Sequence, residues 1–148
     1  MRLTPVKRID LPATMADGEA QAVMSALDTG PEAQDPAARY VGGCVRNSII
    51  GLAPGDIDIA TQYTPDAVIA CLQDAGIRVV ETGRDHGTVT AIGSETGRPF
   101  EITTLRRDVA TDGRHAQVAF SADWIEDARR RDFTMNTLLC DLRGRVYD

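Results

Sequence analysis

A pair of adjacent glycines, Gly42 and Gly43, separates two runs of different character, and it constrains the fold more than any other feature of the chain. The run before the pair, residues 38–41, is short and largely apolar, as a strand is. The run after it, residues 44–50, is typical of a helix, and Gly51 ends it. The sequence therefore predicts a strand, a tight turn and a helix in direct succession.

Short strands and one capped helix follow this unit. Residues 56–60 alternate polar and apolar side chains, as a half-buried strand does. Thr64 is a favourable N-cap for the next helix, and Pro65 is a favourable first residue. Three further β-like runs follow, at residues 77–80, 87–92 and 98–105. We predict a small α/β (α+β) domain with one mixed, mainly antiparallel sheet and helices packed mostly on one face.

The two ends of the chain are less regular. Residues 19–27 predict a short amphipathic helix within an N-terminal extension, residues 1–36, and the main domain then covers residues 37–148. Residues 106–119 are polar and are interrupted by a glycine, so we expect a mobile loop there. Residues 122–131 predict a charged helix.

Charge and cysteine usage restrict the class of protein. The 148 residues carry a formal net charge of −6, so any polynucleotide partner has to be held locally or by another part of the protein. The three cysteines are far apart and form no C-x-x-C pair, so neither a disulfide framework nor a zinc site is indicated. No apolar run approaches the roughly 20 residues that span a bilayer, and the start lacks the apolar segment of a signal peptide. We expect a cytoplasmic protein.

Two aspartates on one predicted strand are the first candidates for chemistry. Asp56 and Asp58 are two residues apart, so their side chains share one face while Ile57 and Ile59 point to the other. Two carboxylates this close repel each other unless cations lie between them, and Mg²⁺ prefers such oxygen ligands. An isolated D-x-D pair is more often a solvated turn, and that alternative stays open.

Glu101 is a candidate third acid. The alternation of its strand puts Phe100 and Ile102 on the face opposite Glu101. If it joined the aspartates, two bridged metal ions about 3.5 to 4 Å apart would activate an attacking hydroxyl and neutralise a leaving pyrophosphate. The alternative is an exposed strand carboxylate.

The glycine pair and two basic segments are candidates for phosphate binding. Without side chains, Gly42 and Gly43 let backbone N–H groups approach a phosphate at a helix start, although a tight turn alone explains them equally. Neither a P-loop nor a dinucleotide-binding fingerprint is present. Arg46 lies one helical turn on, where it can pair with phosphate oxygens. Residues 129–136 form a second basic cluster, for which a solvated helix face is the alternative.

Five short segments, in their order along the chain, show a resemblance to a known family. The segments are Gly42-Gly-Cys-Val-Arg46, Asp56-Ile-Asp58, His86-Gly-Thr88, Glu101-Ile-Thr-Thr-Leu-Arg106 and Arg130-Arg-Asp-Phe-Thr-Met-Asn136. Together they closely resemble the head domain of bacterial class II tRNA nucleotidyltransferases. These are the CCA-adding enzymes and their poly(A) polymerase relatives, within the polymerase beta-like superfamily. The resemblance covers about residues 38–148.

The resemblance implies a role for each group of site residues. The catalytic metal ions, Mg²⁺, would be bound by Asp56 and Asp58, with Glu101 as the third carboxylate. The residues that would meet the nucleotide are Gly42, Gly43 and Arg46 at the triphosphate, Arg131, Asp132 and Asn136 beside the sugar and phosphates, and Asp108 in the family's flexible loop. The family usually has an acid where this chain has Asn47, so a charge-dependent role at that position is in doubt.

The implied activity is CCA addition. CMP and AMP would be transferred from CTP and ATP to the 3′ end of tRNA, with release of pyrophosphate. Family members carry helical neck, body and tail domains after the head, and these grip most of the tRNA. None of them follows Asp148 here, so a head-domain fragment is expected. Three alternatives remain: a poly(A) polymerase, a nucleotide-binding module without turnover, and a D-x-D glycosyltransferase or metal-dependent phosphohydrolase.

Overall fold

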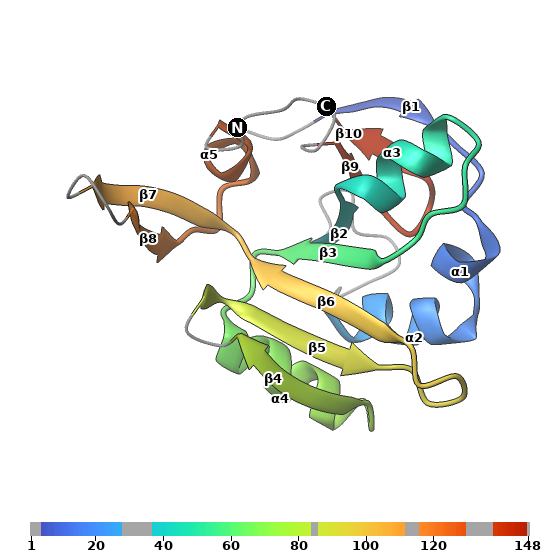
Figure 1. Cartoon of the computed structure of the whole chain (residues 1–148), viewed down its shortest axis with the longest axis horizontal. Helices are drawn as coiled ribbons and strands as arrows, with labels where there is room; N and C mark the ends of the chain where they lie inside the picture. Colours follow the sequence, from blue (N-terminus) through green and yellow to red (C-terminus); the bar gives the residue numbers. More distant parts are fainter. Residues whose placement is uncertain (1–3, 28–36, 84–85, 112–115, 130–137, 148) are drawn as a thin grey trace.

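Eight strands form one sheet in the order β1-β10-β9-β2-β3-β6-β5-β4 in the computed structural model, which describes residues 4–27, 37–83, 86–111, 116–129 and 138–147 (Figure 1). The strands are β1 (Pro5–Arg8), β2 (Ala38–Val41), β3 (Ile57–Thr61), β4 (Arg78–Gly83), β5 (Thr88–Ile92), β6 (Pro99–Thr104), β9 (Leu139–Cys140) and β10 (Arg145–Tyr147). Among these described strands, only the β3–β6 pair is parallel. The predicted mixed, mainly antiparallel sheet is confirmed.

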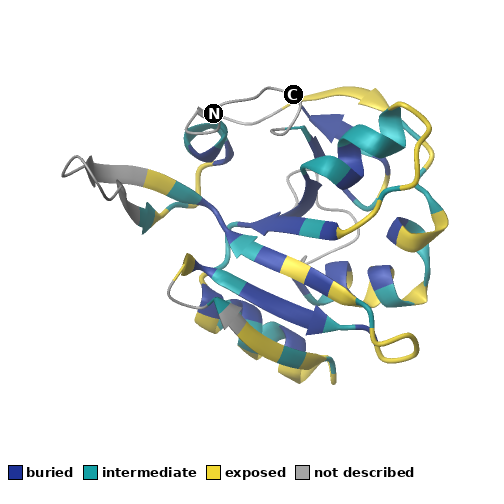
Figure 2. Cartoon of the chain, viewed as in Figure 1, coloured by how far each residue is buried: buried dark blue, intermediate teal, exposed yellow. Residues whose placement is uncertain are grey.

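Two helices cover one face of this sheet. They are α2 (Gly18–Leu27) and α4 (Pro65–Asp74), which lie behind the sheet in Figure 1. The predicted cap of α4 is present, because the Thr64 hydroxyl accepts a hydrogen bond from the Ala67 N–H at 3.4 Å. Phe100 and Ile102 of β6 point to this face and join the main apolar core. Figure 2 shows the matching alternation of buried and exposed residues along β6.

A smaller apolar cluster lies on the opposite face, beside α5 (Trp124–Arg129). Its buried members are Val41, Ala60, Leu105, Trp124, Leu139 and Tyr147. Arg39 of β2 is fully buried there, with its guanidinium carbon 4.4 Å from the Trp124 ring centre and 4.1 Å from that of Tyr147. The two rings compensate part of the cost of burying the charge.

The N-terminal segment packs as part of the same unit. β1 pairs with β10, and α2 follows the short helix α1 (Ala13–Ala16). The Glu19 carboxylate of α2 accepts hydrogen bonds from the backbone N–H groups of Glu95 and Thr96, at 3.1 and 3.2 Å, and from the Thr96 hydroxyl at 2.8 Å. Arg98 Nη2 lies 2.6 Å from Asp17 Oδ1. These contacts tie the start of α2 to the turn between β5 and β6.

The segment after β6 differs from its prediction. Residues 106–119 do not form a loop throughout: β7 (Arg106–Thr111) and β8 (Ala116–Phe120) pair as an antiparallel two-stranded sheet that extends from one side of the molecule (Figure 1). The physical reason lies in the sequence between the two strands, because Asp-Gly between two extended runs strongly favours a hairpin turn. The polar residues of β7 obscure this signal in the sequence.

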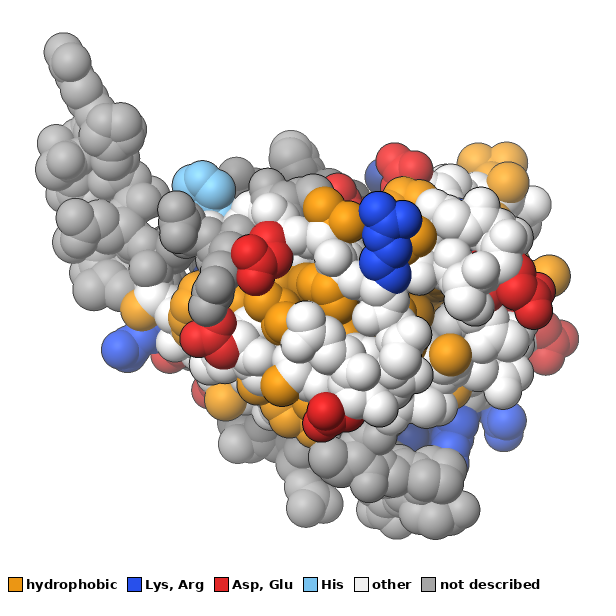
Figure 3. Space-filling model, turned by 90° about the horizontal axis from the view of Figure 1, so that it is seen from below, with side chains coloured by type: hydrophobic (Ala, Val, Ile, Leu, Met, Phe, Trp, Pro, Cys, Tyr) orange, Lys and Arg blue, Asp and Glu red, His pale blue; other side chains and the backbone are white. Residues whose placement is uncertain are grey.

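Two surface properties complete the description. Within the described ranges, every helix is too short or too polar to cross a bilayer. On the side that lies lowest in Figure 1, hydrophobic side chains gather toward the middle, next to a basic side chain and with acidic side chains at separate points around them (Figure 3). The edge strand β4 carries Val80 with 37% of its surface exposed.

Candidate active site

The register of the parallel pair β3–β6 brings two predicted acids together. Asp58 lies directly beside Glu101, and the next pairs along are Ile59 with Ile102 and Ala60 with Thr103. Paired residues on neighbouring strands share a face and have Cβ atoms roughly 5 Å apart. Both carboxylates therefore stand on the face that α2 and α4 leave uncovered. Glu101 is exposed and Asp58 is half-buried.

Threonines extend this polar face onto β5. Thr90 pairs with Glu101, and Thr88 pairs with Thr103. The hydroxyls of Thr88 and Thr103 lie 3.2 Å apart and share a hydrogen bond. The polar face thus spans three strands. A helix packed over it would remove water from the carboxylates, at a large cost in free energy.

Asp56 occupies a different setting from the other two acids. It is exposed and lies one residue before β3 begins. Within the described residues, no three His, Cys, Asp or Glu side chains form a group that could hold a metal ion. The structure therefore pairs Asp58 with Glu101 and does not gather all three predicted acids into one cluster.

The glycine turn has the geometry that its sequence predicts. Gly42 has φ +79°, a left-handed conformation that side chains disfavour, and it precedes α3 (Gly43–Ile49). The backbone N–H groups of Val45 and Arg46 both lie 3.1 Å from the Gly42 carbonyl. A Cβ atom built on Gly43 would lie 3.4 Å from Arg46 Nη2. The Arg46 guanidinium therefore folds back over the glycine turn, as long side chains in helices do.

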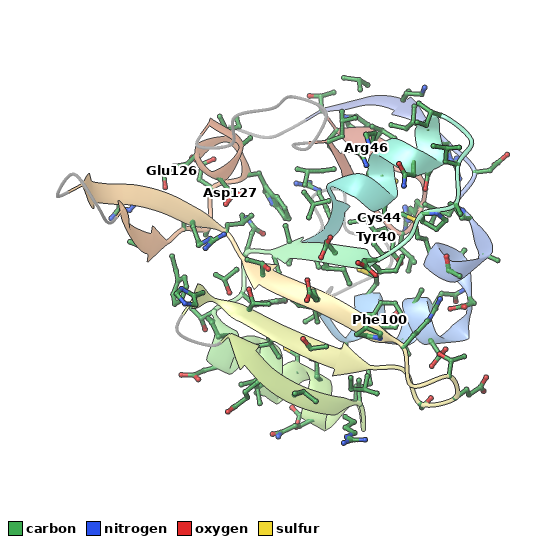
Figure 4. All side chains as sticks on the ribbon, viewed as in Figure 1. Tyr40, Cys44, Arg46, Phe100, Glu126 and Asp127 are labelled. Carbon is green, nitrogen blue, oxygen red and sulfur yellow. The ribbon has the colours of Figure 1, made fainter. Side chains whose placement is uncertain are left out.

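Cys44 ties this turn to the strand that carries Asp58. Its buried thiol lies 3.4 Å from the carbonyl oxygen of Val41, to which it donates, and 3.9 Å from that of Asp58 (Figure 4). Burial raises the pKa of the Cys44 thiol. It therefore stays protonated at neutral pH and acts as a packing group rather than a nucleophile.

Asn47 lies beside Arg46 and was not among the predicted binding residues. Its Oδ1 accepts a hydrogen bond from Arg46 Nε at 3.3 Å, and its Nδ2 donates to the Ala53 carbonyl at 3.1 Å. The signal in the sequence was the amide in place of the family's usual acid. The burial of Arg39 between two aromatic rings is likewise not predictable from the sequence. Its only signal is a charged residue within a short apolar strand.

The acids of α5 have a structural role at the base of the β7–β8 hairpin. Asp127 Oδ1 accepts a hydrogen bond from the Arg106 N–H at 2.9 Å, and Glu126 Oε1 accepts one from the Ser121 hydroxyl at 2.6 Å (Figure 4). The hairpin and the helix are thereby joined where both meet the main sheet. The sequence had indicated only a charged helix.

Several predicted residues fall outside this description. Arg131, Asp132 and Asn136 lie outside the described residues. Asp108 lies on β7, in register with Val118 of β8. Their roles at a nucleotide remain predictions.

Comparison with known proteins places the chain. The model of the poly A polymerase head domain family matches residues 38–148. The chain belongs to the poly A polymerase head domain family. The predicted resemblance and fold class are both confirmed.

Relatives of this chain include CCA-adding enzymes. The human mitochondrial CCA tRNA nucleotidyltransferase 1 is 49% identical over 111 residues, which are 74% of this chain and 25% of that protein. The CCA-adding enzyme of Bacillus pumilus is 38% identical over 113 residues, covering 75% of this chain and 27% of that enzyme. This chain thus spans about a quarter of the length of the curated relatives it matches.

A solved structure agrees with this placement. The Bacillus stearothermophilus CCA-adding enzyme in complex with CTP matches with a TM-score of 0.67 and 34% identity, over 86% of this chain and 28% of that chain. Nucleotidyltransferases of this kind generally use divalent metal ions. Because the relatives include mitochondrial enzymes, the cytoplasmic location stays a prediction.

Proposed function

We propose that this domain is the catalytic head of a template-independent RNA nucleotidyltransferase. It transfers CMP and AMP from CTP and ATP to the 3′ end of tRNA and releases pyrophosphate. The observation that carries the proposal is the parallel β3–β6 register, which sets Asp58 beside Glu101 on the uncovered face of a head domain of this family. The names of the relatives support the choice of tRNA, and the CTP complex of one relative supports the choice of nucleotide.

The donor chemistry of this face fits divalent cations. Asp58 and Glu101 supply carboxylate oxygens, which are the ligands that Mg²⁺ prefers, and Asp56 precedes the same strand. We assign Mg²⁺ to the pair Asp58 and Glu101, and Asp56 would have to approach this pair to serve as the predicted third ligand. When bound, Mg²⁺ would activate the attacking hydroxyl and neutralise the charge of the leaving group. The two paired carboxylates repel each other when both are ionised, so the site has a reason of its own to take up cations.

The remaining residues bind and orient the nucleotide. Arg46 reaches back over Gly43, where it can meet triphosphate oxygens through its planar donors. Gly42 and Gly43 leave the backbone open to the phosphates. Arg131, Asp132 and Asn136 act beside the sugar and phosphates, and Asp108 acts from the hairpin.

The reaction needs no covalent protein intermediate. The RNA 3′-hydroxyl loses its proton to water, and its oxygen forms a bond with the α-phosphorus of the nucleotide. The bond from that phosphorus to the bridging oxygen breaks, and its electron pair leaves with pyrophosphate. Catalysis then rests on charge neutralisation and on holding the two reactants in line.

A second candidate is a nucleotide-binding module without turnover. It is favoured by the separation of Asp56 from the Asp58–Glu101 pair, because the described acids do not form a group of three that could hold a metal ion. A poly(A) polymerase of the same family would share the site and differ in the bases that it adds.

One experiment separates these candidates. The chain is mixed with Mg²⁺, labelled CTP or ATP, and tRNA that lacks its 3′-terminal CCA, and both RNA length and nucleotide binding are measured. Extension with pyrophosphate release supports the enzyme, whereas binding without extension supports the module. Absence of both contradicts the proposal.

A matched pair of variants tests the assignment of the site. D58N should lower extension by about 100-fold or more, because losing a metal ligand removes several kcal/mol of transition-state stabilisation. D74N changes an exposed aspartate at the end of α4 and should retain activity. Equal activity of the two variants would overturn the assignment.

A further inference from the structure

The side chain of Asn47 joins two parts of the candidate site. On one side its Oδ1 accepts from Arg46 Nε at 3.3 Å, and on the other its Nδ2 donates to the Ala53 carbonyl at 3.1 Å. Its own backbone carbonyl accepts from the Leu52 N–H at 2.8 Å. The last two bonds fix the loop that leads from α3 to Asp56. One residue therefore contacts both the phosphate-facing arginine and the approach to the acids.

The two ends of the Asn47 amide have separate tasks. Arg46 Nε carries a hydrogen and can only donate, so it needs an oxygen opposite it. The Ala53 carbonyl can only accept, so it needs the NH₂ group. This arrangement satisfies both partners, whereas the flipped amide would set donor against donor and acceptor against acceptor.

The oxygen of Asn47 acts on the orientation of Arg46. Arg46 Nη2 lies near Gly43, so the guanidinium is placed between the glycine turn and the Asn47 oxygen. An arginine side chain has many rotamers, and a partner that selects one of them lowers the ordering cost when a ligand binds. The hydrogen bond to Asn47 holds Nε in place. Because the guanidinium is planar, it also sets the direction of the two terminal NH₂ groups.

We propose that Asn47 is a positioning residue that holds the Arg46 guanidinium over the glycine turn for the nucleotide triphosphate. The inference rests on the proposed function, since it names what aligns the arginine at that same site. Asn47 acts through Arg46 and need not touch the nucleotide. The part of its side chain that matters for binding is the oxygen, and the part that matters for the loop is the NH₂ group.

Two substitutions separate these parts. N47A removes both the oxygen and the NH₂ group. N47D keeps an oxygen for Arg46 and loses the donor for Ala53. Both variants should therefore lower the melting temperature, by about 2 to 4 °C for each lost hydrogen bond in a domain of this size, so N47A should lower it more than N47D. Only N47A should weaken nucleotide binding.

The measurement is the dissociation constant of the chain for CTP and ATP with Mg²⁺, by titration calorimetry. N47A should raise it about 3- to 10-fold, as expected for losing the alignment of one charge-assisted contact. N47D should restore it to within about threefold of the wild type. S48A is the matched control, because Ser48 donates to the Cys44 carbonyl at 2.6 Å on the same helix and makes no hydrogen bond to Arg46.

A double-mutant cycle tests whether Asn47 acts through Arg46. In an R46A background, N47A should change the dissociation constant by less than about twofold, because the group that it positions is gone. An unchanged dissociation constant in N47A, or an equal effect of N47A with and without Arg46, would overturn the inference while leaving the proposed function intact. N47D as weak as N47A would overturn it as well.

A spectroscopic measurement tests the contact without any nucleotide. The Arg46 Nε–H resonance should be protected from exchange with water in the wild type and in N47D, and it should lose protection in N47A. Equal exchange in all three chains would overturn the inference. A wild type that shows the protection and binds neither nucleotide would instead refute the proposed function, so the two failures are distinguishable.

Discussion

The two faces of β3 and β6 use neighbouring residues of the same strands for different purposes. One face presents Phe100 and Ile102 to the core under α2 and α4, where both are almost fully buried. The other presents Asp58 and Glu101, in register and uncovered by those helices. Because side chains alternate along a strand, a residue that stabilises the core is next to a residue that faces the candidate site. Substitutions at neighbouring positions should therefore affect different measurements.

Phe100 should give the largest effect on stability. F100A removes a fully buried aromatic ring and leaves a cavity, so the free energy of unfolding should fall by about 3 to 5 kcal/mol. Urea denaturation followed by circular dichroism measures it. A loss below about 1 kcal/mol would mean that this face is not the core that we describe.

Gly93 tests how closely α2 meets the strand turn. A Cβ atom at this position would overlap the Glu19 carboxylate, so G93A should displace that side chain from its hydrogen bonds with Glu95 and Thr96 and lower the free energy of unfolding. The same denaturation assay measures the loss. G97A is the informative control, because a Cβ there meets nothing within 4 Å, and its cost comes only from the positive φ of 71°.

Glu19 predicts a pH dependence of stability. The Thr96 hydroxyl, with help from the backbone N–H groups of Thr96 and Glu95 and from Arg98, holds the pKa of Glu19 below its ordinary value of 4.5 against the opposing effect of burial. Folding therefore favours the ionised carboxylate, and its stabilising effect is present above that value and is lost as the pH falls through the lowered pKa. The melting temperatures of the wild type and E19Q should differ at neutral pH and converge on acidification. A constant difference would contradict the pKa direction.

Glu101 should give the smallest effect on stability. E101Q changes an exposed side chain next to Phe100, so the free energy of unfolding should stay within about 0.5 kcal/mol of the wild type. The same variant should lose nucleotide incorporation. Activity retained in E101Q would contradict the claim that the face with Asp58 and Glu101 carries the activity.

The strands of the main sheet were predictable where alternation was strong. Residues 56–60 and 98–105 have a clear period of two, and every end of β3 and β6 lies within one residue of its predicted position. Their parallel register was not predictable, because it depends on partners 43 positions apart in the chain, such as Asp58 and Glu101. The sequence therefore indicated which acids share a face, and the fold decided which of them lie together.

Other elements lacked a local signal. All four residues of β1 are exposed, so their strand character comes from pairing with β10 and not from an apolar pattern. The polar residues of β7 pair with β8 alone, apart from the main sheet, so their sequence lacks a buried apolar face and predicts a loop. The contact of Asn47 with Arg46 depends on side-chain direction, which spacing does not give.

The central claim is that the paired carboxylates of Asp58 and Glu101 take up divalent cations. Titrating the isotope-labelled chain with Mn²⁺ tests it directly, because a bound paramagnetic ion broadens the amide resonances of nearby residues. We predict that the resonances of Asp58 and Glu101 broaden first and that D58N abolishes this preference. Equal broadening at the exposed Asp66 and Asp74 of α4, or the same pattern in D58N, would contradict the account.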